Sequence, residues 1–129
     1  MTPAPLRIAM IGLGDIARKA YLPVLGSRAD VELVFVTRNA ATLAELGAAW
    51  RVQQLHADLD TALAQGLDGA LVHAATAAHP DILRRLLEAG VPTLVDKPIA
   101  DTADESAALV DLAETRGVSL MVGFNRRFA

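Results

Sequence analysis

Short apolar runs rich in β-branched residues alternate along this chain with longer stretches rich in Ala, Leu, Glu and Arg. The apolar runs have the length of strands, and the longer stretches have the length of helices. Strands that alternate with helices form parallel sheets whose faces are covered by those helices. We therefore expect an α/β fold, a doubly wound parallel sheet in a three-layer α/β/α arrangement, within one domain that spans residues 1–129.

The positions of these segments give a specific order of elements. We expect strands at residues 7–11, 31–37, 52–55, 69–74, 92–95 and 119–122, in the spatial order 3-2-1-4-5-6 that is usual for nucleotide-binding sheets. We expect helices at residues 15–25, 40–50, 58–64, 79–89 and 101–116. Gly90 and Gly117 follow two of these helices, at the position where glycine commonly ends a helix. Trp50, Leu43 and Leu46 are expected to pack on a helix face and to have no role in chemistry.

Composition excludes several classes of protein and of site. Apolar residues make up 53% of the chain and charged residues 21%, so the chain is not disordered, and its net charge of −3 argues against nucleic acid or an anionic membrane as a partner. The absence of cysteine excludes disulfides, a thiolate nucleophile and thiolate metal ligands. His56, His73 and His79 lack metal-ligand spacing, so we expect no metal site. No apolar run reaches the roughly 18 residues of a membrane span. The first residues do not resemble a signal peptide, and a cytoplasmic location is the default expectation.

A glycine motif joins the first predicted strand to the first predicted helix. Its sequence fits the pattern G-x-G-x-x-A, which in this context is typical of dinucleotide binding: Gly12-Leu13-Gly14-Asp15-Ile16-Ala17. Gly12 would permit a tight turn, Gly14 would let a pyrophosphate approach the backbone, and Ala17 would let helix and strand pack closely. The free N–H groups at the helix start, around Asp15 and Ile16, would attract phosphate. The alternative is an ordinary strand-to-helix turn.

The end of the second predicted strand bears on the choice of cofactor. NAD-binding domains place a carboxylate there, on the ribose 2′-hydroxyl, whereas this strand ends in Thr37-Arg38-Asn39. Glu32 lies at the wrong end of the strand for that contact. The planar guanidinium of Arg38 can instead pair with a 2′-phosphate, and Thr37 and Asn39 can add hydrogen bonds. We therefore predict NADP rather than NAD. The alternative is that Arg38 is a solvated charge, in which case NAD is not disfavoured.

Further segments follow the glycine motif in a characteristic order: Leu22-Pro23, His79, Ala89-Gly90, Asp96-Lys97-Pro98 and Met121-Val122-Gly123-Phe124-Asn125-Arg126-Arg127-Phe128. From about Arg7 to its last residue the chain resembles the N-terminal nucleotide-binding domain of the glucose–fructose oxidoreductase and inositol dehydrogenase family (Gfo/Idh/MocA). The resemblance implies an NAD(P)-dependent oxidoreductase that transfers a hydride between a nicotinamide cofactor and a hydroxyl-bearing carbon of a sugar or polyol. It also implies a C-terminal substrate domain that these 129 residues do not include. We thus expect cofactor binding by this chain without meaningful turnover.

The resemblance also assigns roles around the fifth predicted strand. Lys97 is expected to lie near both the nicotinamide and the substrate hydroxyl, as a catalytic and cofactor-binding residue. A lysine just past the carboxyl end of a parallel strand can donate a hydrogen bond to the reacting hydroxyl and stabilise charge that develops on its oxygen. Asp96 occupies the position of a glutamate in the family, and it is shorter by one methylene group.

Other assignments concern the loop after the fourth predicted strand and the histidines. The loop would lie against the nicotinamide-side ribose and the pyrophosphate; here Ala74-Ala75 replaces the family's Thr-Pro, and Thr76 follows. His79 is expected to orient its surroundings or to cap a helix rather than to act as a general base. His73 is expected to be a core residue and His56 a surface residue. Asn125-Arg126-Arg127 either crosses toward the second domain or is solvated.

Several alternatives remain open at this stage. The chain is an oxidoreductase domain or a non-catalytic module that binds NADP to regulate or to interact; a third option is a degenerate relative that binds nothing. The substrate and the direction of reaction are not encoded in these residues. An apolar surface left exposed by a missing second domain would favour a homo-oligomer.

Overall fold

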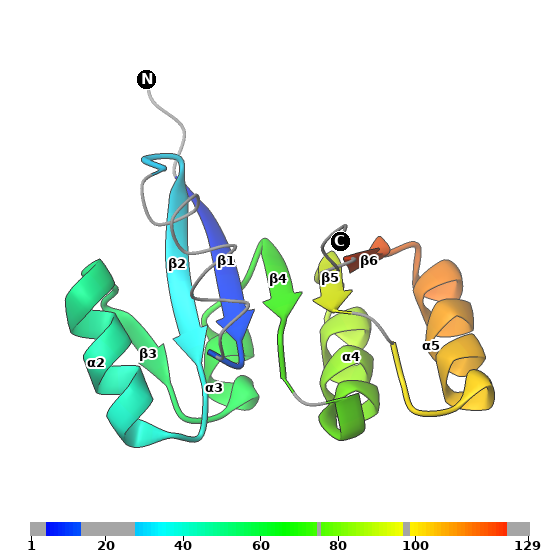
Figure 1. Cartoon of the computed structure of the whole chain (residues 1–129). Helices are drawn as coiled ribbons and strands as arrows, with labels where there is room; N and C mark the ends of the chain where they lie inside the picture. The colour runs from blue at the N-terminus through cyan, green and yellow to red at the C-terminus, as the bar shows by residue number, and fades with distance from the viewer. Residues whose placement is uncertain (1–4, 14–27, 75, 97–98, 124–129) are drawn as a thin grey trace, which may run out of the picture.

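The computed structural model describes residues 5–13, 28–74, 76–96 and 99–123. Strands and helices alternate along most of this part of the chain, as Figure 1 shows, and their bounds are β1 (Leu6–Ile11), β2 (Val31–Val36), α2 (Ala40–Trp50), β3 (Gln54–His56), α3 (Leu59–Ala64), β4 (Gly69–Val72), the 3₁₀ turn η2 (Thr76–Ala78), α4 (His79–Glu88), β5 (Thr93–Asp96), α5 (Ala103–Arg116) and β6 (Leu120–Gly123). The helix predicted at residues 15–25 lies outside the described residues.

The strands form one six-stranded sheet in the order β3-β2-β1-β4-β5-β6, and every neighbouring pair is parallel. This is the predicted order. The direction of winding reverses between β1 and β4, where Ile8 pairs with Gly69 and Ile11 pairs with Val72. In open parallel sheets, ligands bind outside the carboxyl ends of the strands at such a reversal.

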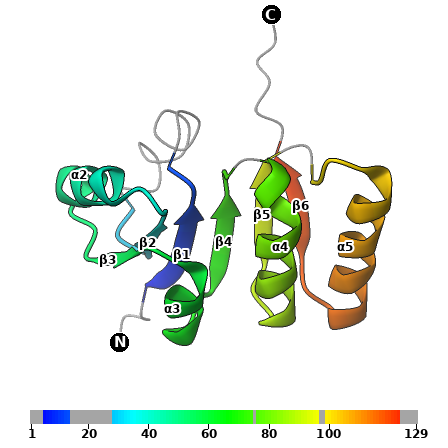
Figure 2. The same cartoon turned by 90° about the horizontal axis from the view of Figure 1, so that it is seen from below.

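Two apolar clusters lie on opposite faces of the sheet. In Figure 2, α3, α4 and α5 lie in a row on one face, whereas α2 lies on the other face beside β2 and β3. Ala9, Ile11, Val34 and Val36 face the three-helix side, and they pack with buried leucines of those helices. Met10, Leu33 and Phe35 alternate with these residues and face α2, because successive strand side chains point to opposite faces. They form a second cluster with Leu13 and Leu46, and Leu43 and Trp50 pack against it. The predicted packing role of Trp50 is confirmed.

Helix ends differ from the predicted bounds where a capping side chain sets the boundary. The last helix begins at Ala103 rather than at residue 101, because the Thr102 hydroxyl accepts the backbone N–H of Glu105 at 3.1 Å. It ends, as predicted, at Gly117, which adopts a left-handed φ of 67°. The third strand lies at 54–56, one or two residues later than predicted, because Gln54 and His56 pair with Val34 and Val36 of β2.

His56 departs from its predicted surface location. It ends β3 and is only 8% exposed, because it lies opposite Val36 on the face that α3 covers. Its ring Nδ1 lies 2.8 Å from the hydroxyl oxygen of Thr61 in α3. The prediction failed because one polar residue in a three-residue strand carries no periodic signal. His73, expected in the core, follows β4 and is half-buried.

No helix in the part of the chain that the structure describes is long and apolar enough to cross a membrane. The same residues contain no group of three or more His, Asp or Glu side chains that is suited to hold a metal ion.

Candidate nucleotide site at the carboxyl edge of the sheet

A cavity of about 500 Å³ opens at the carboxyl ends of β1 and β2, and the segments that lead into α3 and α4 complete it. It lies at the reversal of the sheet, where ligands of such folds bind. The lining residues that bear on function are Gly12, Thr37, Arg38, Asp58, Ala74, Asp81 and Arg85. Four of the sequence-predicted site residues, Gly12, Thr37, Arg38 and Ala74, are thus brought to one cavity.

Gly12 meets two separate demands that exclude a side chain. Its φ is 85°, in the left-handed region that glycine tolerates. A Cβ placed on it would lie 2.8 Å from the backbone nitrogen of Ala74 and 2.9 Å from the carbonyl carbon of His73. The Gly12 N–H donates to the Val36 carbonyl at 2.9 Å, so the turn is fixed between β2 and the end of β4. The space that a side chain would need is thus filled by the backbone of His73 and Ala74, which agrees with the tight turn predicted at Gly12.

The segment after β2 presents one cation and one helix cap. The Asn39 Oδ1 accepts the Thr42 backbone N–H at 3.0 Å, which caps α2, and the backbone N–H of Asn39 donates to the Thr37 hydroxyl at 3.4 Å. The amide oxygen of Asn39 is therefore already engaged. Arg38 is exposed, lines the cavity and makes no ion pair with any other described residue. Its guanidinium is the group of this segment best suited to an anionic ligand.

The opposite rim carries acidic groups and a neutralised arginine. Arg85 of α4 contacts Asp60 at 3.0 Å and Asp81 at 3.2 Å. Asp58 caps α3 by accepting the Thr61 backbone N–H at 2.9 Å, and this hydrogen bond holds the pKa of its carboxyl below the usual 3.8. Desolvation opposes this shift, whereas the Thr61 side chain and the nearby Arg85 lower the pKa of Asp58 further. Of these two lining arginines, Arg85 is paired with carboxylates, whereas Arg38 has no ion-pair partner among the described residues.

The rim residues Asp58, Asp81 and Arg85 were not predicted as part of the site. Asp58 could have been found, because it follows the third strand, and residues that follow parallel strands gather at the carboxyl edge. Asp81 and Arg85 lie inside a helix, and nothing in the local sequence pattern distinguishes them from solvated helix charges.

The segment between β4 and α4 contains three of the predicted residues, of which Ala74 lines the cavity. Thr76 begins the 3₁₀ turn η2, and His79 begins α4. The His79 ring is 1% exposed, and its two nitrogens lie near the carbonyl oxygens of Ala74 and Ile99. Asp96 is the last residue of β5. The other predicted residues lie outside the part of the chain that the structure describes: Gly14, Asp15, Ile16, Ala17, Ala75, Lys97 and Asn125-Arg126-Arg127.

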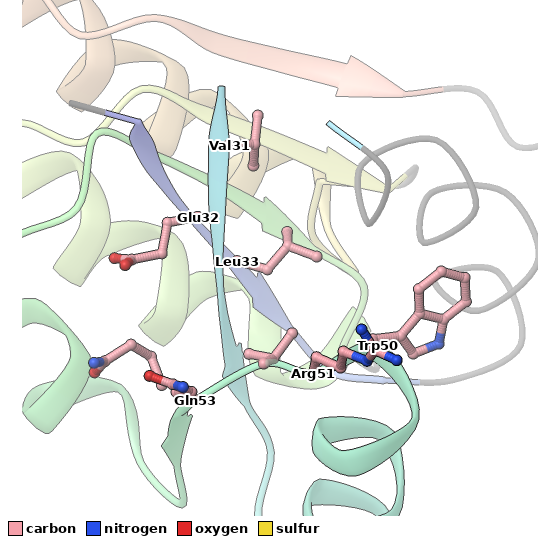
Figure 3. Close-up of a pocket in the computed structure, with 8 residues that line it drawn as sticks. Val31, Glu32, Leu33, Trp50, Arg51 and Gln53 are labelled. Carbon is pink, nitrogen blue, oxygen red and sulfur yellow. The ribbon is translucent and has the colours of Figure 1, made fainter. Parts of the chain in front are cut away.

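A second hollow, of about 270 Å³, lies at the other end of β2, and Figure 3 shows the side chains around it. Val31, Glu32 and Leu33 line it together with Trp50 and Arg51 at the end of α2. Glu32 is paired there with Arg7 at 3.0 Å. The carboxylate that sequence spacing alone would offer to a ribose therefore lies at the amino end of the strand, away from Thr37 and Arg38.

Comparison with known proteins agrees with this geometry. The family model described as an oxidoreductase family with an NAD-binding Rossmann fold matches residues 6–124. The chain is 42% identical to the putative oxidoreductase YceM of Salmonella typhimurium, and the alignment covers 96% of this chain and 40% of that protein. It is 38% identical to the myo-inositol dehydrogenase Hyg17 of Streptomyces leeuwenhoekii, and this alignment covers 95% of this chain and 38% of that enzyme.

A solved structure shows the same fold at higher identity. The crystal structure of a Gfo/Idh/MocA family oxidoreductase from Vibrio cholerae aligns with a TM-score of 0.89 and 48% identity. The alignment covers 93% of this chain and 39% of that one. The chain therefore spans about 40% of the length of the proteins that it matches.

Proposed function

The chain belongs to the Gfo/Idh/MocA oxidoreductase family, whose NAD-binding Rossmann fold it carries, and from that premise we propose that it is the NADP-binding domain of a sugar or cyclitol dehydrogenase. The observation that carries the proposal is that Gly12 and Arg38 line one cavity at the reversal of the sheet. Gly12 makes the tight turn that would lead the chain to the pyrophosphate, and Arg38 supplies the charge that a 2′-phosphate requires.

The residues that would hold the nucleotide divide between its two halves. Thr37 and Arg38 would contact the adenosine ribose and its 2′-phosphate, and the segment from Gly12 through Gly14, Asp15, Ile16 and Ala17 would bind the pyrophosphate. Ala74, Ala75, Thr76 and His79 would lie on the nicotinamide side. When bound, the nicotinamide supplies the hydride chemistry that no side chain can perform.

Lys97 is the residue that we assign to catalysis, together with cofactor contact. It comes directly after Asp96, the last residue of β5, so we expect it at the same edge of the sheet as the cavity. Its ammonium group would donate a hydrogen bond to the substrate hydroxyl and stabilise negative charge on that oxygen as the hydride moves. Asp96 would contribute to the same end of the site.

The substrate class is proposed from the relatives. Hyg17 is named a myo-inositol dehydrogenase, and an inositol 2-dehydrogenase of Rhizobium meliloti is 30% identical to this chain. Both names describe oxidation of a ring hydroxyl. We infer that the whole protein acts on a polyol or sugar of that kind, with the substrate pocket supplied largely by residues beyond this chain.

Arg38 gives the direct test of the NADP assignment. We expect Arg38→Ala to weaken NADPH binding by about tenfold to a hundredfold, because a charge-assisted hydrogen bond to phosphate is lost. The affinity for NADH, which lacks that phosphate, should change by less than about twofold. Isothermal titration calorimetry with both nucleotides measures the two affinities.

Arg84→Ala is the matched control, because Arg84 is an exposed arginine of α4 that does not line the cavity. It should leave both affinities unchanged. If the unmodified chain binds NADH as tightly as NADPH, or if Arg38→Ala weakens both equally, the NADP assignment is wrong. If neither nucleotide binds at all, the assignment as a cofactor domain is wrong.

A further inference from the structure

One buried side chain connects the two segments that follow β4 and β5. The His79 ring, 1% exposed, has its Nε2 2.9 Å from the Ala74 carbonyl oxygen and its Nδ1 3.0 Å from the Ile99 carbonyl oxygen. Ala74 follows β4 by two residues, and Ile99 follows β5 by three. The contacts therefore span 5 and 20 positions in sequence and join segments that the backbone does not connect directly.

Two contacts of this ring lead to segments outside its own helix. The N-cap position of α4 is Ala78, which makes no side-chain cap hydrogen bond, and a proline lies in the first turn. A capping imidazole would have to accept a backbone N–H of the first turn. The Ile99 and Ala74 atoms beside the His79 ring are carbonyl oxygens, which only accept hydrogen bonds. Of the two roles expected for His79, these two contacts favour orientation of its surroundings.

The number of N–H groups on the ring decides how many carbonyl oxygens it can bind at once. A neutral imidazole has one N–H and donates to one carbonyl at a time, whereas the doubly protonated ring donates to both. In either form the ring is enclosed between the two segments, because it is almost fully buried. Removing it would leave two partly buried carbonyl groups without this donor, and such groups lose stability where water cannot replace the donor.

The two connected segments lie where the second half of a dinucleotide would bind. β4 and β5 are neighbours on the side of the reversal away from β2 (Figure 1). Because the adenosine half lies over the end of β2 in folds of this kind, the other half extends over β4 and β5. Ala74 also packs against Gly12, so its position affects the turn as well. The segment between β5 and Ile99 contains Lys97.

We propose that His79 is a positioning residue that holds the segments after β4 and β5 together, so that the nicotinamide half of the cofactor meets a preformed surface. The proposal rests on the proposed nucleotide-binding function. A preformed surface avoids the loss of entropy that ordering two loops on binding would require. The adenosine half, which lies over β2, does not depend on His79.

The test compares a whole dinucleotide with its adenosine half on the full 129-residue chain. We expect His79→Leu to weaken NADPH binding by about tenfold, and to change the affinity for adenosine 2′,5′-bisphosphate by less than about twofold. An amide nitrogen of Asn matches the position of ring Nδ1, and that of Gln matches Nε2. His79→Asn should therefore keep the contact to Ile99, His79→Gln should keep the contact to Ala74, and both variants should bind NADPH with intermediate affinity.

Leu86→Val is the matched control for stability, because Leu86 is a fully buried residue of the same helix and the change removes one methylene group from the core without removing a hydrogen bond to either segment. It should lower the urea midpoint and leave the ratio of the two affinities unchanged. Backbone amide hydrogen exchange at residues 99–102 should quicken in His79→Leu and not in Leu86→Val. If His79→Leu does not fold, the Asn and Gln variants carry the same comparison.

The outcomes separate the two proposals. If the unmodified chain binds NADPH and the bisphosphate, but the His79 variants weaken both ligands equally or neither, His79 is a structural residue and the positioning role is wrong. If the unmodified chain binds neither these ligands nor the pair NADH and AMP, the nucleotide-binding function fails, and the role of His79 fails with it.

Discussion

At the scale of single residues, Gly12 shows most directly how the site depends on the absence of a side chain. Its left-handed backbone and the 2.8 Å approach to the Ala74 nitrogen are independent requirements. Gly66 shares the first requirement, with φ of 88°, but a Cβ there would meet nothing within 4 Å. Comparing alanine variants of Gly12 and Gly66 therefore separates the energetic cost of the backbone conformation from that of the close contact.

We expect Gly66→Ala to lower the free energy of unfolding by about 1 kcal/mol, the cost of a left-handed conformation for a residue with a Cβ. Gly12→Ala should cost at least about 2 kcal/mol, because the backbone of Ala74 must also move. It should also weaken nucleotide binding, which Gly66→Ala should not. Urea unfolding of both variants measures the difference; equal losses of stability would show that the contact at Gly12 relaxes without cost.

Asp58 gives a prediction of pH dependence at the same scale. Its carboxyl accepts the Thr61 N–H, which lowers the pKa of the folded state below the ordinary 3.8. A lowered folded-state pKa stabilises the protein above the unfolded pKa, and that contribution is lost as the pH falls through the folded pKa. Asp58→Asn keeps a capping oxygen but does not titrate. Its urea midpoint should therefore fall less steeply below pH 3.8 than that of the unmodified chain; parallel profiles would contradict this.

At the scale of elements, capping side chains set the boundaries that bring functional residues to the sheet edge. Asn39, Asp58 and Thr102 each accept the backbone N–H three residues later, at the start of α2, α3 and α5. Two of these helices begin directly beside the cavity, because Arg38 precedes the cap of α2 and Asp58 is itself a lining residue. The caps thus fix where each strand-to-helix segment turns, and with it the rim of the site.

We expect Thr102→Ala to lower the free energy of unfolding by about 1 kcal/mol, because the first turn of α5 loses its cap. Thr115→Ala is the control: Thr115 is exposed in the last turn of the same helix, and alanine has the higher helix propensity. It should leave stability unchanged or raise it by about 0.5 kcal/mol. Both changes are measured by urea unfolding. A loss at Thr115 equal to that at Thr102 would show that the cap contributes nothing specific.

At the scale of the whole molecule, the described residues form one six-stranded sheet, and the chain spans about 40% of the length of its relatives. The cavity contains groups that we propose hold a nucleotide, and we propose that the substrate pocket lies largely in residues beyond this chain. Self-association of the chain stays a prediction; Met121 of the edge strand β6, 63% exposed, is the residue at which to test it.

We expect the 129-residue chain to bind NADPH and to show no turnover of myo-inositol, the substrate named for the relative Hyg17. Binding is measured by calorimetry, and turnover by the absorbance of reduced nucleotide formed from NADP⁺. Hyg17 in the same assay, with the cofactor that it uses, verifies the conditions. Steady reduction that depends on myo-inositol and scales with the concentration of this chain would show that the chain is catalytically sufficient.

The sequence alone determined the alternation of elements and the position of the glycine turn, because both are encoded in local periodicity and in residues adjacent along the chain. The strand order was inferred from these two features together, since the order 3-2-1-4-5-6 is usual for nucleotide-binding sheets. It also placed Arg38 at the end of its strand. The tertiary structure decided that Asp58, Asp81 and Arg85 form the opposite rim, that His56 is buried, and that His79 joins Ala74 to Ile99. These contacts bring together segments distant in sequence, and they depend on how helices pack on the sheet, which no local pattern specifies.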